Sequence, residues 1–121
     1  MWVPGAVILY HFTCAHGDAG IQRDGYIKPM SNREIRIPEP VVWLSSSASA
    51  QRRALGLTSH TLKCDRMEHL YRVNTADAVP WSNYRLGLSR FAVMQLEAVT
   101  GTRPMLWWLS ETPLSDIERI K

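Results

Sequence analysis

The sequence predicts one domain of the α+β class that spans residues 1–121. Of the 121 residues, 45% are hydrophobic and 21% are charged, proportions typical of a globular protein that folds alone. Short runs rich in β-branched and aromatic residues predict strands, whereas the segment at about 88–100 repeats its apolar residues at helical spacing. We therefore expect a β-sheet with one main helix and short helical turns.

The first predicted strand covers residues 6–13. Alternation places Leu9 and His11 on one face of this strand, and Tyr10 and Phe12 on the other. Because both faces are largely apolar, we expect the strand to be central in the sheet and His11 to be at least partly buried.

The remaining elements follow from the same patterns. In chain order they are two helical turns at 16–24, a strand at 41–44, a half-buried strand at 66–73, the main helix at about 88–100 and a strand at 105–109. Gly25 and Gly101 stand where the two helical segments would stop. Residues 30–40 and 45–62 are predicted loops, and the chain after Pro113 is a predicted polar tail.

Composition excludes several classes of protein. The chain has 14 basic and 11 acidic residues, for a net charge of +3, but its arginines are spread from Arg23 to Arg119, which is weak evidence for a nucleic-acid surface. The apolar run at 3–10 is too short for a membrane span and lacks the features of a secretory signal. We expect a cytoplasmic protein that does not bind membranes.

Cysteines and tryptophans add two further expectations. Cys14 and Cys64 lack the spacing of zinc ligands, so no metal site is expected. The sequence leaves open whether the two cysteines form a disulfide, and reduced thiols are the default expectation. Of the five tryptophans, we expect burial of the three in strand-like runs and partial exposure of Trp2 and Trp81.

The chain lacks the common short signatures of dinucleotide, P-loop, zinc-protease and hydrolase sites. It does resemble small bacterial and phage proteins of the ADP-ribosyltransferase-like superfamily, which includes the RNA 2′-phosphotransferases. The resemblance rests on Tyr10-His11-Phe12-Thr13, Gly20-Ile21, Gly25-Tyr26-Ile27-Lys28-Pro29, Pro40-Val41-Val42-Trp43-Leu44-Ser45, Arg72-x-Asn74, Trp81 and Trp107-Trp108-Leu109-Ser110-Glu111-Thr112-Pro113. It covers almost the whole chain.

This resemblance implies an ADP-ribosyltransferase-like split β-sheet with a cleft that binds NAD as a substrate. In that cleft His11 orients the adenosine ribose, and Glu111 is the catalytic carboxylate at the nicotinamide ribose. A carboxylate suits this role because cleavage of the nicotinamide bond builds oxocarbenium character. We therefore expect His11 and Glu111 to face one cleft, with the serine-rich loop between them.

Four further residues complete the predicted NAD contacts: Thr13, Trp43, Ser45 and Arg52. The resemblance places at residues 43–46 the family's middle site position, a tyrosine that stacks on nicotinamide or a serine that fixes the cleft. Trp43 could stack there, and we expect Ser45, at the strand end, to be the more accessible group. The Arg52-Arg53 pair could grip a pyrophosphate, because guanidinium forks match phosphate oxygens.

Each candidate residue also has a plain structural interpretation. His11 could be a strand histidine satisfied by a backbone carbonyl, and Glu111 could be a solvated carboxylate. The serine cluster after Leu44 is more often a flexible loop than a phosphate cradle.

Three functions follow from these observations. The first is an NAD-binding ADP-ribosyltransferase-like protein that transfers ADP-ribose to a macromolecule, protein or nucleic acid, or hydrolyses NAD. The alternative is a catalytically inactive copy of the fold that acts as a protein-binding module, and the third is an RNA 2′-phosphotransferase. The sequence leaves the oligomeric state open.

Overall fold

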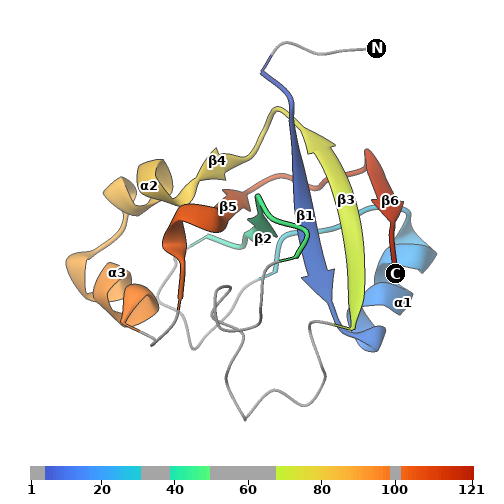
Figure 1. Cartoon of the computed structure of the whole chain (residues 1–121), viewed down its shortest axis with the longest axis horizontal. Coiled ribbons are helices and arrows are strands. Elements are labelled where there is room, and N and C mark those ends of the chain that lie inside the picture. The colour runs from blue at the N-terminus through green and yellow to red at the C-terminus, as the bar shows by residue number, and fades with distance from the viewer. Residues whose placement is uncertain (1–4, 31–38, 50–67, 99–101) are drawn as a thin grey trace.

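The computed structural model describes residues 5–30, 39–49, 68–98 and 102–121 (Figure 1). Six strands form one antiparallel sheet in the order β4-β5-β2-β1-β3-β6. The strands are β1 (Val7–Thr13), β2 (Val42–Ser45), β3 (His69–Thr75), β4 (Val79–Pro80), β5 (Trp107–Ser110) and β6 (Ile117–Arg119). The α+β class is confirmed. Within the described strands the sheet is continuous, without the split that the resemblance implies.

The predicted central position of the first strand is confirmed. β1 pairs with β3 along its whole length, from Val7 opposite Thr75 to Thr13 opposite His69. Its other edge pairs with β2, where Tyr10 lies opposite Ser45. The side chains of β1 therefore project toward both faces of the sheet, and each face needs its own cover.

Helix α1 (Ala15–Asp24) covers the face of the sheet that carries Leu9, and it ends where the sequence predicts. Gly25 adopts a left-handed conformation (φ 80°), and its N–H donates to the Ile21 carbonyl at 2.8 Å, which closes the helix. Ile21 packs into the core on this face. The buried members of this core are Leu9, Ile21, Ile27, Val42, Leu44, Tyr71, Val73 and Leu114.

Three short elements cover the opposite face at the β4–β5–β2 end: α2 (Trp81–Tyr84), η2 (Arg85–Gly87) and α3 (Arg90–Glu97). In Figure 1 α2 lies beside β4 and β5 and α3 lies at the same side of the molecule, whereas α1 lies near β3 and β6. The rings of Trp43, Trp81 and Trp107 pack together here, with centroids 5.4–6.0 Å apart. Such pairs add to the stabilisation that comes from burial.

Trp81 corrects an expectation of the sequence analysis. Its side chain was expected to be partly exposed, yet the residue is only 2% exposed. The indole Nε1 donates to Glu97 Oε2 at 2.8 Å, so its one polar atom is satisfied by the last turn of α3.

The helix predicted at about 88–100 is shorter in the structure, because α3 has eight residues and begins after Ser89. The Ser89 hydroxyl accepts from the Ala92 N–H at 3.1 Å and caps the helix. At ten residues α1 is longer than α3, so the expectation of one main helix is wrong. Residues 99–101 lie outside the described residues.

Two strand predictions also need correction. The last predicted strand starts later, because Pro104–Leu106 forms a 3-10 turn (η3) before β5. The predicted polar tail contains β6, whose Ile117 lies opposite Val73 of β3 and packs against the first core. Among the described residues, no helix has the length and apolar character needed to cross a bilayer.

Cys14 is disulfide-bonded, so the expectation of reduced thiols is wrong for this residue. The chain has two cysteines, and Cys64 lies outside the described residues. Disulfides are typical of oxidising compartments, so this finding does not favour a cytoplasmic location, which stays a prediction.

Two leucines in different environments test the arrangement of the second core. Leu109 is 0% exposed in β5, whereas Leu86 is 81% exposed in η2. We expect Leu109→Ala to lower the free energy of unfolding by about 2–5 kcal/mol in urea denaturation, because it leaves a cavity. Leu86→Ala should change it by less than about 0.5 kcal/mol. Equal effects of the two substitutions would contradict this packing.

Candidate functional site

His11 and Thr13 lie on the face of the sheet that α1 covers. His11 is opposite Tyr71 in the ladder and therefore shares its face. Its Nδ1 lies 2.9 Å from the backbone carbonyl oxygen of Trp43, on the neighbouring strand. This contact matches the structural interpretation of His11, a strand histidine satisfied by a carbonyl.

Thr13 is 8% exposed and lies beneath the first turn of α1. A Cβ at position 17 would collide with its Oγ1, so glycine at this position allows the helix to approach the strand closely. The Thr13 hydroxyl is thus covered by the helix, and a ligand would have to displace α1 to reach it.

Trp43 and Ser45 share a face, as alternation predicts, and it is the face opposite His11. The Trp43 ring packs against Trp81 and Trp107 in the second core. Ser45 is 1% exposed, so the expectation that it is accessible is wrong. Its hydroxyl donates to the Ser47 carbonyl and accepts from the Ser47 N–H, both at 3.0 Å, which closes a turn at the strand end.

Glu111 follows β5 and lies at the mouth of a cavity of about 340 Å³ on the α2 side of the sheet. Its Oε2 accepts a hydrogen bond from the Tyr84 hydroxyl at 3.0 Å. Burial and this bond raise the pKa of Tyr84 to about 12, so the phenol keeps its proton at neutral pH. The cavity is also lined by Asp77, Val79, Leu109 and Thr112.

The described residues do not bring the predicted site together. His11 faces α1, whereas Glu111 contacts α2 across the sheet. Ser45 lies opposite Trp107, four residues before Glu111, which separates them by roughly 13 Å along the strand. Arg52, the predicted pyrophosphate contact, lies outside the described residues, together with Arg53.

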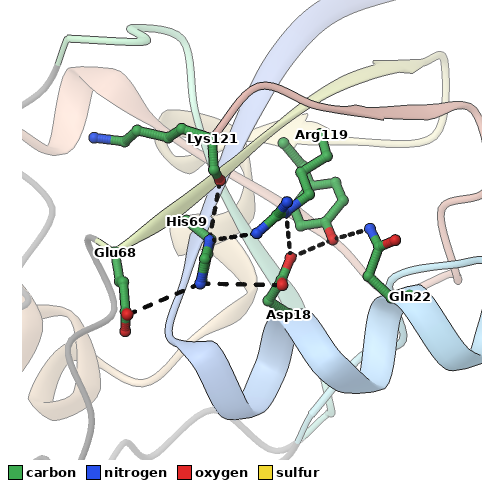
Figure 2. A network of polar contacts seen from close by, with 7 residues as sticks. Asp18, Gln22, Glu68, His69, Arg119 and Lys121 are labelled. Carbon is green, nitrogen blue, oxygen red and sulfur yellow. Dashed lines mark hydrogen bonds and ion pairs between the residues drawn. The ribbon is translucent and has the colours of Figure 1, made fainter.

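A polar network that the sequence analysis did not anticipate joins α1, β3 and β6 (Figure 2). Asp18 Oδ1 accepts from the Tyr71 hydroxyl at 2.6 Å and from Arg119 Nε at 2.9 Å. Gln22 Nε2 donates to the same Tyr71 oxygen at 2.8 Å. We call these residues, with His69, the C-terminal clamp.

The His69 ring lies beside two alternative hydrogen-bond partners in the clamp. Its Nδ1 lies 3.0 Å from Arg119 Nη2 and 3.2 Å from the backbone oxygen of Lys121. One ring nitrogen accepts from the guanidinium or donates to the carbonyl, but does not do both at once.

The charge states of the clamp favour a structural role. The bond from Tyr71 holds the pKa of Asp18 below its ordinary value, and Arg119 lowers it further against the opposing effect of burial. Burial, together with the bond to Asp18, raises the pKa of Tyr71. The ionised Asp18 accepts from the protonated Tyr71, and this bond joins α1 to β3. Neither group has a pKa near neutral pH, as a general base would need.

A groove on the helical side is the other candidate for function. We define the η2–α3 groove by its apolar residues Leu86, Leu88, Val93 and Met94 and its charged residues Arg85, Arg90 and Glu97; its volume is about 390 Å³. Leu86 is 81% exposed and Met94 is 63% exposed. Large apolar side chains gathered at a hollow are typical of binding surfaces.

Substitution of Asp18 tests the clamp through pH. The pKa of Asp18 lies below that of an aspartate in an unfolded chain, so its stabilisation is complete above the ordinary pKa and is lost as the pH falls through the lowered one. We expect Asp18→Asn to lower the free energy of unfolding by about 1–3 kcal/mol at neutral pH. The difference from the wild type should shrink between about pH 5 and pH 3.

Urea denaturation across this pH range provides the measurement. Asp24→Asn is the comparison variant: Arg23, its neighbour on the same helix, and Lys28 lower the pKa of Asp24, but its pair with Arg23 is exposed, so we expect a smaller pH-dependent loss. A constant difference between Asp18→Asn and the wild type at all pH values would show that the carboxylate charge does not stabilise the fold.

Within the described residues no group of three or more histidine, cysteine or acidic side chains is placed to hold a metal ion. Comparison with protein family models, curated proteins and solved structures gives no match to this chain. The resemblance to the ADP-ribosyltransferase-like superfamily therefore stays a prediction from sequence motifs.

Proposed function

We propose that this protein acts as a protein-binding module and that the η2–α3 groove is its contact surface. The observation that carries this proposal is the exposure of Leu86 and Met94 at the rim of one groove. Covering exposed apolar side chains makes a large favourable contribution to the free energy of binding, and the flexible methionine side chain fits different surfaces. The residues that line the groove include none of the described side chains predicted to hold NAD.

The placement of the predicted NAD contacts supports this proposal over an enzymatic one. His11 is engaged by a backbone carbonyl, and the Ser45 hydroxyl is used within its own turn. A nucleotide would have to compete with these partly buried bonds, and breaking such a bond leaves a costly unsatisfied group.

Selection of peptides tests the binding function. We expect a displayed library of random dodecapeptides to give binders whose affinity drops roughly tenfold or more on Met94→Asp, because a carboxylate enters the apolar rim. Met30→Asp is the matched control, since Met30 is 62% exposed and Met94 is 63% exposed. Leu86→Asp should repeat the effect of Met94→Asp. Binders that tolerate both groove substitutions would contradict the proposal.

An NAD-dependent ADP-ribosyltransferase is the second candidate, favoured by one observation. Glu111 is exposed at a cavity beside a tyrosine that keeps its proton, so a carboxylate acceptor and a hydroxyl donor lie together. The resemblance assigns NAD as the substrate and Glu111 as the residue that stabilises the developing oxocarbenium ion. His11, on the other face, would then have no part in the same cleft.

Calorimetry with NAD separates the two candidates. For a binding module, we expect no heat of binding at millimolar NAD. If NAD binds and is consumed, the transferase becomes the leading function, and Glu111→Gln should then abolish turnover with little change in affinity. Glu118→Gln is the control, because that exposed carboxylate pairs with Arg72 at the far edge of the sheet.

A further inference from the structure

We infer that the partner of the η2–α3 groove presents an acidic segment with large apolar side chains. This inference rests on the proposed binding function and assigns the chemistry of the partner. It follows from the charges around the groove, from the position of Arg90 and from the size of the hollow.

The only acidic side chain of the groove is already used inside the protein. Glu97 Oε2 accepts from the buried indole of Trp81 at 2.8 Å and lies 3.4 Å from Arg85 Nη1. The carboxylate therefore satisfies a core group and offsets Arg85. Among the groove's charged side chains, Arg90 then supplies the excess positive charge.

Arg90 occupies the first position of α3, at the positive end of the helix dipole. The first turn of α3 contains no acidic residue to compensate, and Ser89 satisfies one of the exposed N–H groups. The dipole and the guanidinium add to each other, although a basic residue here is mildly unfavourable for the helix itself. A carboxylate of a partner would relieve this unfavourable arrangement.

The apolar part of the groove determines what accompanies the carboxylate. A volume of about 390 Å³ is near the lower end of the range for ligand pockets, so it fits a short anchor rather than a long helix. Leu86 and Met94 at the rim are suited to leucine, methionine or aromatic side chains. The expected ligand is therefore a short segment with one or two apolar anchors next to aspartate or glutamate.

The sequences of the selected dodecapeptides test this inference. We expect enrichment of aspartate and glutamate beside leucine, methionine or aromatic residues, relative to the unselected library. A synthetic copy of the strongest binder should bind Arg90→Glu roughly tenfold more weakly than the wild type, and its affinity should fall as salt is raised. Glutamate at a helix N-terminus is favourable, so Arg90→Glu should fold at least as well as the wild type.

Arg23→Glu is the matched charge reversal, because Arg23 is 74% exposed and lies on α1 at the other face. It should leave the affinity unchanged. Binders that depend on Met94 but show no acidic enrichment and no loss on Arg90→Glu would overturn this inference and leave the proposed function standing.

Two other outcomes would also contradict the inference. If no binder depends on Met94 or Leu86, the proposed function and this inference fall together. If single-stranded oligouridine binds, loses affinity on Arg90→Glu, and displaces the peptides, the groove recognises phosphate rather than a protein carboxylate, and the inference is overturned.

Discussion

The fold depends on covering both faces of a sheet whose central strands are apolar on both sides. Leu9 of β1 is buried on one face, while Trp107 and Leu109 of β5 are buried on the other. Burial of each such side chain contributes about 1.5–3 kcal/mol, so neither face can stay open to water. Helix α1 covers one face, and α2 with α3 covers part of the other. Strand side chains beneath these helices are consequently enclosed, whereas Ile8 of β1, on the partly covered face, is 49% exposed.

Elements that depend on interactions between residues close in the sequence are predicted correctly, whereas those that depend on residues far apart in the sequence are missed. The position of β1 and the end of α1 at Gly25 depend on alternation and on a local cap, and both were predicted correctly. β6 was not, because Ile117-Glu118-Arg119 has little strand character of its own. It becomes a strand because the edge of β3 offers unpaired backbone groups; the Asn74 N–H, for example, donates to the Asp116 carbonyl at 3.0 Å. The partner of Trp81 lies sixteen residues away, which likewise leaves no local signal.

The serine at the end of β2 illustrates how a candidate site residue can be misjudged from its position alone. Trp-Leu-Ser occurs twice, at 43–45 and at 108–110, on strands that pair with each other. Ser110 repeats the turn of Ser45, because its hydroxyl donates to the Thr112 carbonyl at 2.9 Å and accepts from the Thr112 N–H at 3.2 Å. The repeated tripeptide is a signal for two strand-ending turns, and this local role accounts for serine at both places.

Glu97 connects the core of the protein with its proposed binding surface. The same carboxylate satisfies the buried Trp81 indole and lies beside Arg85 at the groove. Removing it would leave a buried donor without its acceptor and would also add positive charge to the groove. The stability of the α2–α3 region and the electrostatic character of the η2–α3 groove are therefore not independent. A change that makes the groove more basic at Glu97 also removes the hydrogen-bond acceptor of the buried Trp81 indole, whereas a change at the exposed Arg90 removes no such bond.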